Sequence, residues 1–186
     1  MKEVYYPGCK IKGGYPETSQ RISAYLKKNR RLEPAGCCKQ DYGMMEDGDT
    51  AVLICNNCVK DLTANTGEVP IHFVYEIIDE DTQFHYPDRT GEEWIIQDCG
   101  HGYQGHDMEG TVRSLLQKMH AAYQELPEER KVKDGMCAQE HIFTVQNNEE
   151  LFQNKHVVTY CGICNRYLLN DGIDAHMLAE LLFSEN

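Results

Sequence analysis

Two pairs of cysteines have the spacing that suits a metal or redox centre. Cys55 and Cys58 form one C-x-x-C, and Cys161 and Cys164 form the other. Each pair follows a short apolar run, TAVLI or HVVTY, at a point where a helix is expected to begin. Two sulfurs one helical turn apart point the same way, and a helix N-terminus stabilises the thiolate form that binds metal. The spacing therefore indicates a soft metal, and leaves zinc and iron–sulfur both open.

The other cysteines recur in the same order in two halves of the chain. KEVYYPGCKIKGG and EEWIIQDCGHGYQG each run from a short apolar strand through a cysteine into a Gly-rich loop, and an amphipathic helix follows. The segment from His72 to Ile78 similarly matches that from His176 to Leu182. This order predicts a duplicated unit. The first copy holds Cys9, Cys37, Cys38, Cys55 and Cys58, and the second holds Cys99, Cys137, Cys161 and Cys164.

Alternating strands and helices predict an α/β fold of two pseudo-symmetric strand-loop-helix repeats with parallel strands. The helices are indicated by apolar spacing, as at Ile22 and Leu26 or at Val112 and Leu116. Ligands of such folds bind in the loops at the carboxyl ends of the strands, where the cysteines are expected. We expect a first repeat over residues 1–86 and a second over 87–186, packed as one compact unit.

The composition indicates in which cellular compartment the protein is expected and which class of partner is disfavoured. Nine cysteines in 186 residues are below the roughly 8–10% of a disulfide-stapled scaffold. The sequence shows no secretory leader and no run of roughly 18 apolar residues, so a cytoplasmic protein with free thiols and no membrane insertion is expected. A formal net charge of −12 disfavours nucleic acid as a partner.

The cysteine pattern resembles the cysteine-rich CCG domain of the heterodisulfide reductase B subunit, the glycolate oxidase iron–sulfur subunit and lactate-utilisation proteins. YYPGC, GCC, CNNC, DCGH and CGIC are the segments that resemble it, and they span nearly the whole chain. Lys39 stands where the motif has a glycine, and Cys137 stands alone where the family has two adjacent cysteines. The resemblance implies a [4Fe-4S]-type cluster, noncubane in form, on the five cysteines of the first repeat. It implies a cubane cluster or a four-thiolate zinc on the four of the second.

Other residues have weaker signals. Gly100, Gly102 and Gly105 spell G-x-G-x-x-G, but the helical pattern continues towards Glu125, where a dinucleotide fold needs a second strand, so no nucleotide is expected. His101 is more simply a loop residue than a ligand. Two histidine–glutamate pairs, His72 with Glu76 and His176 with Glu180, are expected on helices, and a surface or capping role is favoured for them over metal binding. Two cations, Lys39 and Arg166, stand near cysteines in the sequence.

Three functions follow, in order of preference. The first is an iron–sulfur protein that transfers electrons, with possible disulfide reduction, for a partner oxidoreductase subunit or a soluble electron carrier. The second is a zinc-bound structural or interaction module with its site in the second repeat. The third is a cofactor-free thiol–disulfide oxidoreductase, which would use only two of the nine cysteines. No catalytic residue is assigned.

Overall fold

The computed structural model describes residues 1–100, 103, 105–128, 131 and 150–184. Contacts divide the chain into two units, Met1–Asp81 and Thr82–Asn186. The sequence prediction placed the boundary after residue 86, in the same connection between the two units. None of the helices in the described ranges is both long and apolar enough to cross a membrane.

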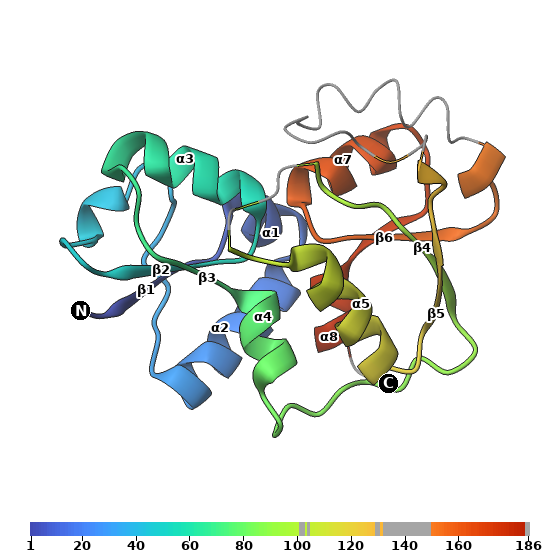
Figure 1. The fold of residues 1–186 in the computed structure, drawn as a ribbon, viewed down its shortest axis with the longest axis horizontal. Helices are drawn as coiled ribbons and strands as arrows, with labels where there is room; N and C mark the ends of the chain where they lie inside the picture. Colours follow the sequence, from blue (N-terminus) through green and yellow to red (C-terminus); the bar gives the residue numbers. More distant parts are fainter. Residues whose placement is uncertain (101–102, 104, 129–130, 132–149, 185–186) are drawn as a thin grey trace. The chain divides into compact units, whose positions relative to one another are not determined.

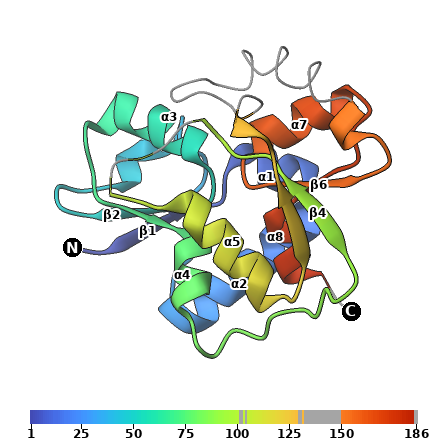
Figure 2. The same cartoon turned by 45° about the vertical axis from the view of Figure 1, so that its right-hand side comes forward.

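The first unit is a three-stranded parallel sheet of order β1-β2-β3, formed by β1 (Glu3–Tyr6), β2 (Thr50–Leu53) and β3 (Ile71–Phe73). The helical elements are α1 (Cys9–Gly14), α2 (Pro16–Arg30), the 3-10 turn η1 (Tyr42–Met44), α3 (Asn56–Thr66) and α4 (Val74–Glu80). In both Figure 1 and Figure 2, α3 lies on one side of the strands, and α2 and α4 lie on the other. Helices thus cover both faces of the sheet, as parallel strands require.

The second unit repeats this plan with one more strand. Its parallel sheet has the order β5-β4-β6-β7, formed by β4 (Glu93–Ile96), β5 (Ala122–Glu125), β6 (His156–Thr159) and β7 (Ala175–Met177). Within the described residues of this unit, the helices are α5 (Met108–Lys118), α7 (Gly162–Asn170) and α8 (Leu178–Phe183). The first unit has a bridge between Tyr5 and Pro34 where β5 pairs with β4. The predicted α/β fold with parallel strands is therefore confirmed.

The apolar spacing predicted from the sequence marks the buried face of α2, and the structure shows which residues begin α2 and α5. Pro16 occupies the first turn of α2, where its missing N–H costs no hydrogen bond, and Ile22 and Leu26 are fully buried. Asp107 caps α5 by accepting a hydrogen bond from the backbone N–H of Gly110 at 2.8 Å. The apolar spacing thus gives the buried face of each long helix.

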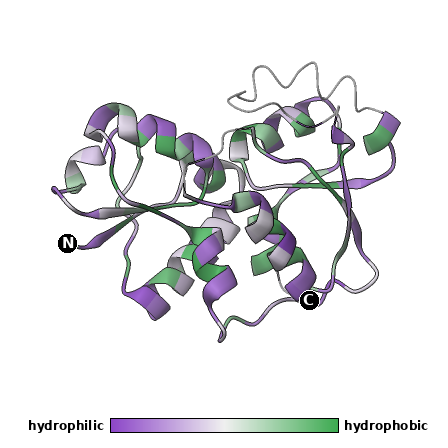
Figure 3. Ribbon diagram, viewed as in Figure 1, coloured by the Kyte–Doolittle hydropathy of each residue, from purple (hydrophilic) through white to green (hydrophobic). Residues whose placement is uncertain are grey.

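The segments that begin at His72 and His176 are strands that lead straight into helices. His72 lies on β3 and His176 on β7, so the prediction that each histidine shares a helix with its glutamate is wrong. Burial alternates along the three residues of each strand, as is typical of a strand in a sheet, and the helix begins directly after them. Glu76 and Glu180 instead cap α4 and α8, accepting from the N–H groups of Phe73 at 3.3 Å and Met177 at 3.1 Å. Figure 3 shows that both short helices are rich in hydrophobic residues.

The helix of the G-x-G-x-x-G segment ends earlier than the sequence predicted. His120 has a φ of 56°, and the N–H of Ala121 donates to the carbonyl of Leu116 at 3.0 Å, which closes α5. The chain then forms β5, which ends at Glu125. The prediction of a helix continuing towards Glu125 is therefore wrong.

Candidate metal centres

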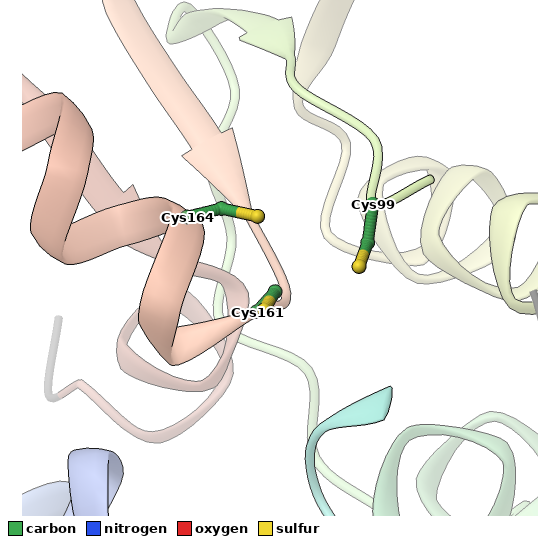
Figure 4. Close-up of side chains that lie close together, drawn as sticks. All are labelled: Cys99, Cys161 and Cys164. Carbon is green, nitrogen blue, oxygen red and sulfur yellow. The ribbon is translucent and has the colours of Figure 1, made fainter. Parts of the chain in front are cut away.

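The second unit brings three cysteines together at the carboxyl ends of β4 and β6. The sulfurs of Cys99, Cys161 and Cys164 lie within 4.8 Å of one another, and all three residues are buried. Figure 4 shows Cys164 and Cys161 at the start of α7 and Cys99 on the facing loop after β4. A buried, all-sulfur group of this size could hold a soft metal ion.

Local geometry sets the position of each sulfur. Cys161 is the N-cap residue of α7 with extended backbone, φ −112° and ψ 117°. Cys164 follows inside the first turn, so both side chains lie at the positive end of the helix. The backbone N–H of Cys99 donates to the Tyr160 hydroxyl at 3.0 Å. Because Tyr160 directly precedes Cys161, this bond ties the two cysteine-bearing loops together.

The thiol of Cys164 interacts with both of the other thiols in this group. The hydrogen bond of Cys164 to Cys161, its bond to Cys99 and its burial together raise the pKa of the Cys164 thiol well above its usual value. Without a cation, the group therefore retains a proton on Cys164. A bound metal would replace that proton and balance the charge of the thiolates.

The first unit has a looser group, because the sulfurs of Cys38, Cys55 and Cys58 do not all lie within 4.8 Å of one another. Cys55 is the N-cap residue of α3, and the free thiol of Cys58 is hydrogen-bonded to the thiols of Cys38 and Cys55. The bond from Cys58 lowers the pKa of Cys38, while the bonds to Cys38 and Cys55 raise that of Cys58. Gly8 has a φ of 74°, and a Cβ there would lie 3.1 Å from Cγ2 of Ile54. Glycine thus lets the loop after β1 pass close to the C-x-x-C.

The other two predicted ligands of the first unit are more open. Cys9 is exposed at the start of α1, and Cys37 is half-buried with its N–H donating to Asp41 at 2.7 Å. Partial burial and then the negative charges of Cys37 and Cys38 raise the pKa of Cys9. The structure therefore joins Cys38, Cys55 and Cys58 by hydrogen bonds, and relates Cys9 to the neighbouring cysteines through electrostatic interaction.

The predicted cations differ in their surroundings. Lys39 forms an ion pair with Asp61 at 3.2 Å, and its positive charge acts to lower the pKa of both Cys9 and Cys38. Arg166 is exposed on α7. Cys137 and His101, two further residues considered from the sequence, lie outside the described residues.

An ion network that the sequence reasoning missed borders the cysteines of the second unit. Arg113 on α5 donates to both carboxylate oxygens of Asp98, at 2.8 and 2.6 Å, and to Glu125 at 2.9 and 2.6 Å. Burial opposes the charge of Arg113, but the bonds to Asp98 and Glu125 prevail and raise its pKa. Asp98, which directly precedes Cys99, was the feature of the sequence that could have indicated this network. Glu125, which a dinucleotide fold would use for a ribose, is here a partner of Arg113.

No family model matches the chain, and a search of curated proteins gives no match either.

Proposed function

We propose that this chain is an iron–sulfur protein that transfers electrons for a partner oxidoreductase. The observation that supports a soft-metal centre best is the burial of Cys99, Cys161 and Cys164 with their sulfurs within 4.8 Å, and the resemblance of the cysteine pattern to the CCG domain favours iron–sulfur as its occupant. The hydrogen-bonded group of Cys38, Cys55 and Cys58 in the first unit adds a second set of thiols. The duplicated order of the cysteines in the sequence supports one centre in each unit.

The residues present suit such a centre chemically. Thiolates are the usual protein ligands of iron–sulfur clusters, and burial together with hydrogen bonding sets the potential of a cluster. Cys137 is the candidate fourth ligand of the second unit, and Cys9 and Cys37 are further candidates in the first. A cluster would supply one-electron chemistry, while the chain itself holds the ligands, excludes water from them and places helix N-termini beside them. A partner oxidoreductase subunit or a soluble carrier would supply the electron.

Zinc binding by the second unit is the second candidate, because of the sulfur separation. A Zn–S distance of about 2.3 Å places the sulfurs of a tetrahedral site about 3.8 Å apart. Sulfurs within 4.8 Å of one another would need only a small adjustment to reach that geometry. The protein would then be a structural or interaction module.

Thiol–disulfide exchange has less support from the geometry. An attacking cysteine needs access and a lowered pKa. Both cysteines of each C-x-x-C are buried, and the pKa values of Cys58 and Cys164 are raised. These properties favour ligands over nucleophiles.

Metal and sulfide analysis of protein prepared without oxygen or chelators tests the proposal. An iron–sulfur protein should be brown, with broad visible absorbance and iron and sulfide in equal amounts. Colourless protein with stoichiometric zinc would replace the proposal with the second candidate. Protein free of both metals that cycles one dithiol would overturn both in favour of thiol exchange.

A further inference from the structure

A second cluster of metal-ligand side chains lies at the other end of the second unit's sheet. Nδ1 of His156 is 2.6 Å from one carboxylate oxygen of Asp174, and Nε2 of His176 is 2.9 Å from the other. One ligand atom from each residue lies within 4.8 Å of those of the other two. From the sequence, His176 with Glu180 had no apparent third ligand. The structure supplies two further candidates, His156 and Asp174.

Strand register brings the three side chains together. Val157 pairs with Ala175, and the N–H of Val157 donates to the carbonyl of Asp174 at 2.9 Å, so His156 and Asp174 stand side by side at the start of their strands. Asp174 and His176 are two residues apart and therefore project from the same face. His156 is five residues before Cys161, roughly 16 Å along an extended strand. The cluster is thus separate from the cysteine group.

Trp94 on β4 supports the two imidazole rings. It pairs with His156 in the sheet, and its ring centroid lies 5.3 Å from that of His156 and 5.2 Å from that of His176. Trp94 itself is 5% exposed, so it provides a rigid wall for both rings. Packing of this kind fixes the orientation of metal ligands.

The same side chains remain open to solvent. The side chains of His156, Asp174 and His176 are 56%, 57% and 36% exposed. Both histidines also line a cavity of about 430 Å³, together with Arg89 and Glu180. A metal ion could therefore enter without unfolding, and the cavity has room for a water or another small ligand.

We propose that His156, Asp174 and His176 form a binding site for a divalent transition-metal ion, with Zn²⁺ as the expected occupant. Two imidazoles and one carboxylate with an open fourth position are a ligand set that zinc uses in proteins. At Zn–ligand distances of about 2.0–2.1 Å, tetrahedral ligand atoms lie about 3.3 Å apart. The contacts of 2.6 and 2.9 Å are made to different oxygens of Asp174. One ligand atom from each of the three residues lies within 4.8 Å of the other two, so side-chain rotation has to change these separations by no more than about 1.5 Å. Glu180, 4.0 Å from Nδ1 of His176, adds negative charge behind that ligand.

The first unit contains a natural comparison site. The positions that correspond in register to Trp94, His156, Asp174 and His176 are Glu3, Thr50, Pro70 and His72. His72 is the one histidine among them, and it is paired with Glu3 at 2.7 Å. His72 therefore serves as a matched control for a lone histidine on an equivalent strand.

Trp94 is the only tryptophan of the chain and gives the experiment a local readout. Ni²⁺ quenches tryptophan fluorescence on contact, and Ni²⁺ at the cysteines would be too far away to do so. Titration of the intact protein with Ni²⁺ should give saturable quenching that is reversed by Zn²⁺ and by a chelator. Ni²⁺ taken up by the cysteines would move the titration to more equivalents without itself quenching Trp94.

Variants decide whether the quenching comes from this cluster. His156→Gln and His176→Gln should each weaken Ni²⁺ binding at least tenfold, Asp174→Asn should weaken it about tenfold with unchanged side-chain shape, and His72→Gln should leave it unchanged. All four sites are solvent-exposed, and circular dichroism checks that the fold is kept. Absence of saturable quenching, or equal quenching in His156→Gln, would show that the cluster is only a hydrogen-bonded group. Failure of Zn²⁺ to compete would overturn zinc as its occupant.

Discussion

The two units resemble each other most at the carboxyl ends of their strands and least at the amino ends. At the carboxyl ends, each has an N-cap cysteine, Cys55 or Cys161, and a second cysteine bonded to two others. At the amino ends, the first unit has a contact of Nδ1 of His72 with the Glu3 carboxylate at 2.7 Å, whereas the second has the His156–Asp174–His176 cluster. The two units thus share one chemistry at the carboxyl ends and differ at the opposite end of the sheet, since a fold does not by itself fix the sites built on it.

The units also differ in the source of the third sulfur. In the second unit it is buried Cys99, from the loop after the first strand, whereas the corresponding Cys9 is exposed and Cys38 takes part instead. The residue before each of these cysteines differs as well. Gly8 in the first unit has a positive φ, and Asp98 in the second is bonded to Arg113. Two similar cysteine patterns therefore produce two different arrangements of ligands.

The largest expected effect comes from removing the second cysteine of either C-x-x-C. Cys164→Ser should abolish the metal centre of the second unit and leave that of the first, and Cys58→Ser should do the reverse, because each sulfur is bonded within its own unit. Metal content and visible absorbance of the two variants measure this directly. Loss of both centres in either folded variant would contradict one centre per unit.

A smaller effect is expected from the ion network beside Cys99. Arg113→Met leaves Asp98, whose side chain is 9% exposed, without its cation, and should destabilise the second unit by about 3 kcal/mol. Urea unfolding measures the loss, and Arg113→Met combined with Asp98→Asn should recover part of it. Lys39→Met is the control in the first unit: its side chain is 56% exposed, so loss of its ion pair should cost less than about 1 kcal/mol. Equal costs for the two methionine variants would show that burial does not distinguish these networks.

The smallest expected effect is a gain of binding by the first unit. Thr50→His with Pro70→Asp would place a histidine and a carboxylate beside His72, reproducing the ligand set of the second unit. In a background of His156→Gln and His176→Gln, this change should tighten Ni²⁺ binding about tenfold, measured by calorimetry. Thr50→His alone, with one ligand fewer, should give less. If the double change has no effect, the register match is insufficient and the packing by Trp94 is needed as well.

Local sequence patterns predicted the parts of the site that depend on neighbours in the chain. Apolar runs gave β2 and β6, and the C-x-x-C spacing gave two cysteines at the start of each following helix. The apolar spacing of Ile22 and Leu26 gave the buried face of α2. These features follow from strand and helix periodicity, which acts over a few residues.

Three features could not be predicted from local sequence patterns. The strand β5 lies in a stretch whose pattern continues that of α5, and it forms because the chain turns at His120 and pairs with β4. His72 and His176 fit the spacing of a helix, yet they lie on strands because the sheet extends to them. The Arg113 network joins residues from a loop, a helix and a strand. Each depends on pairing or packing between distant segments.

The repeated order of strands, helices and cysteines, the parallel α/β class and the edge of the sheet that carries the cysteines all follow from the amino-acid sequence. Only the folded chain shows that Cys99 meets Cys161 and Cys164, that Cys38 takes the place of Cys9, and that His156 joins Asp174 and His176. The difference arises because sequence patterns act over a few residues, whereas these contacts join distant segments. Periodicity fixes the direction of a side chain relative to its own element, whereas the distance between side chains of different elements is set by strand register and burial of the whole core.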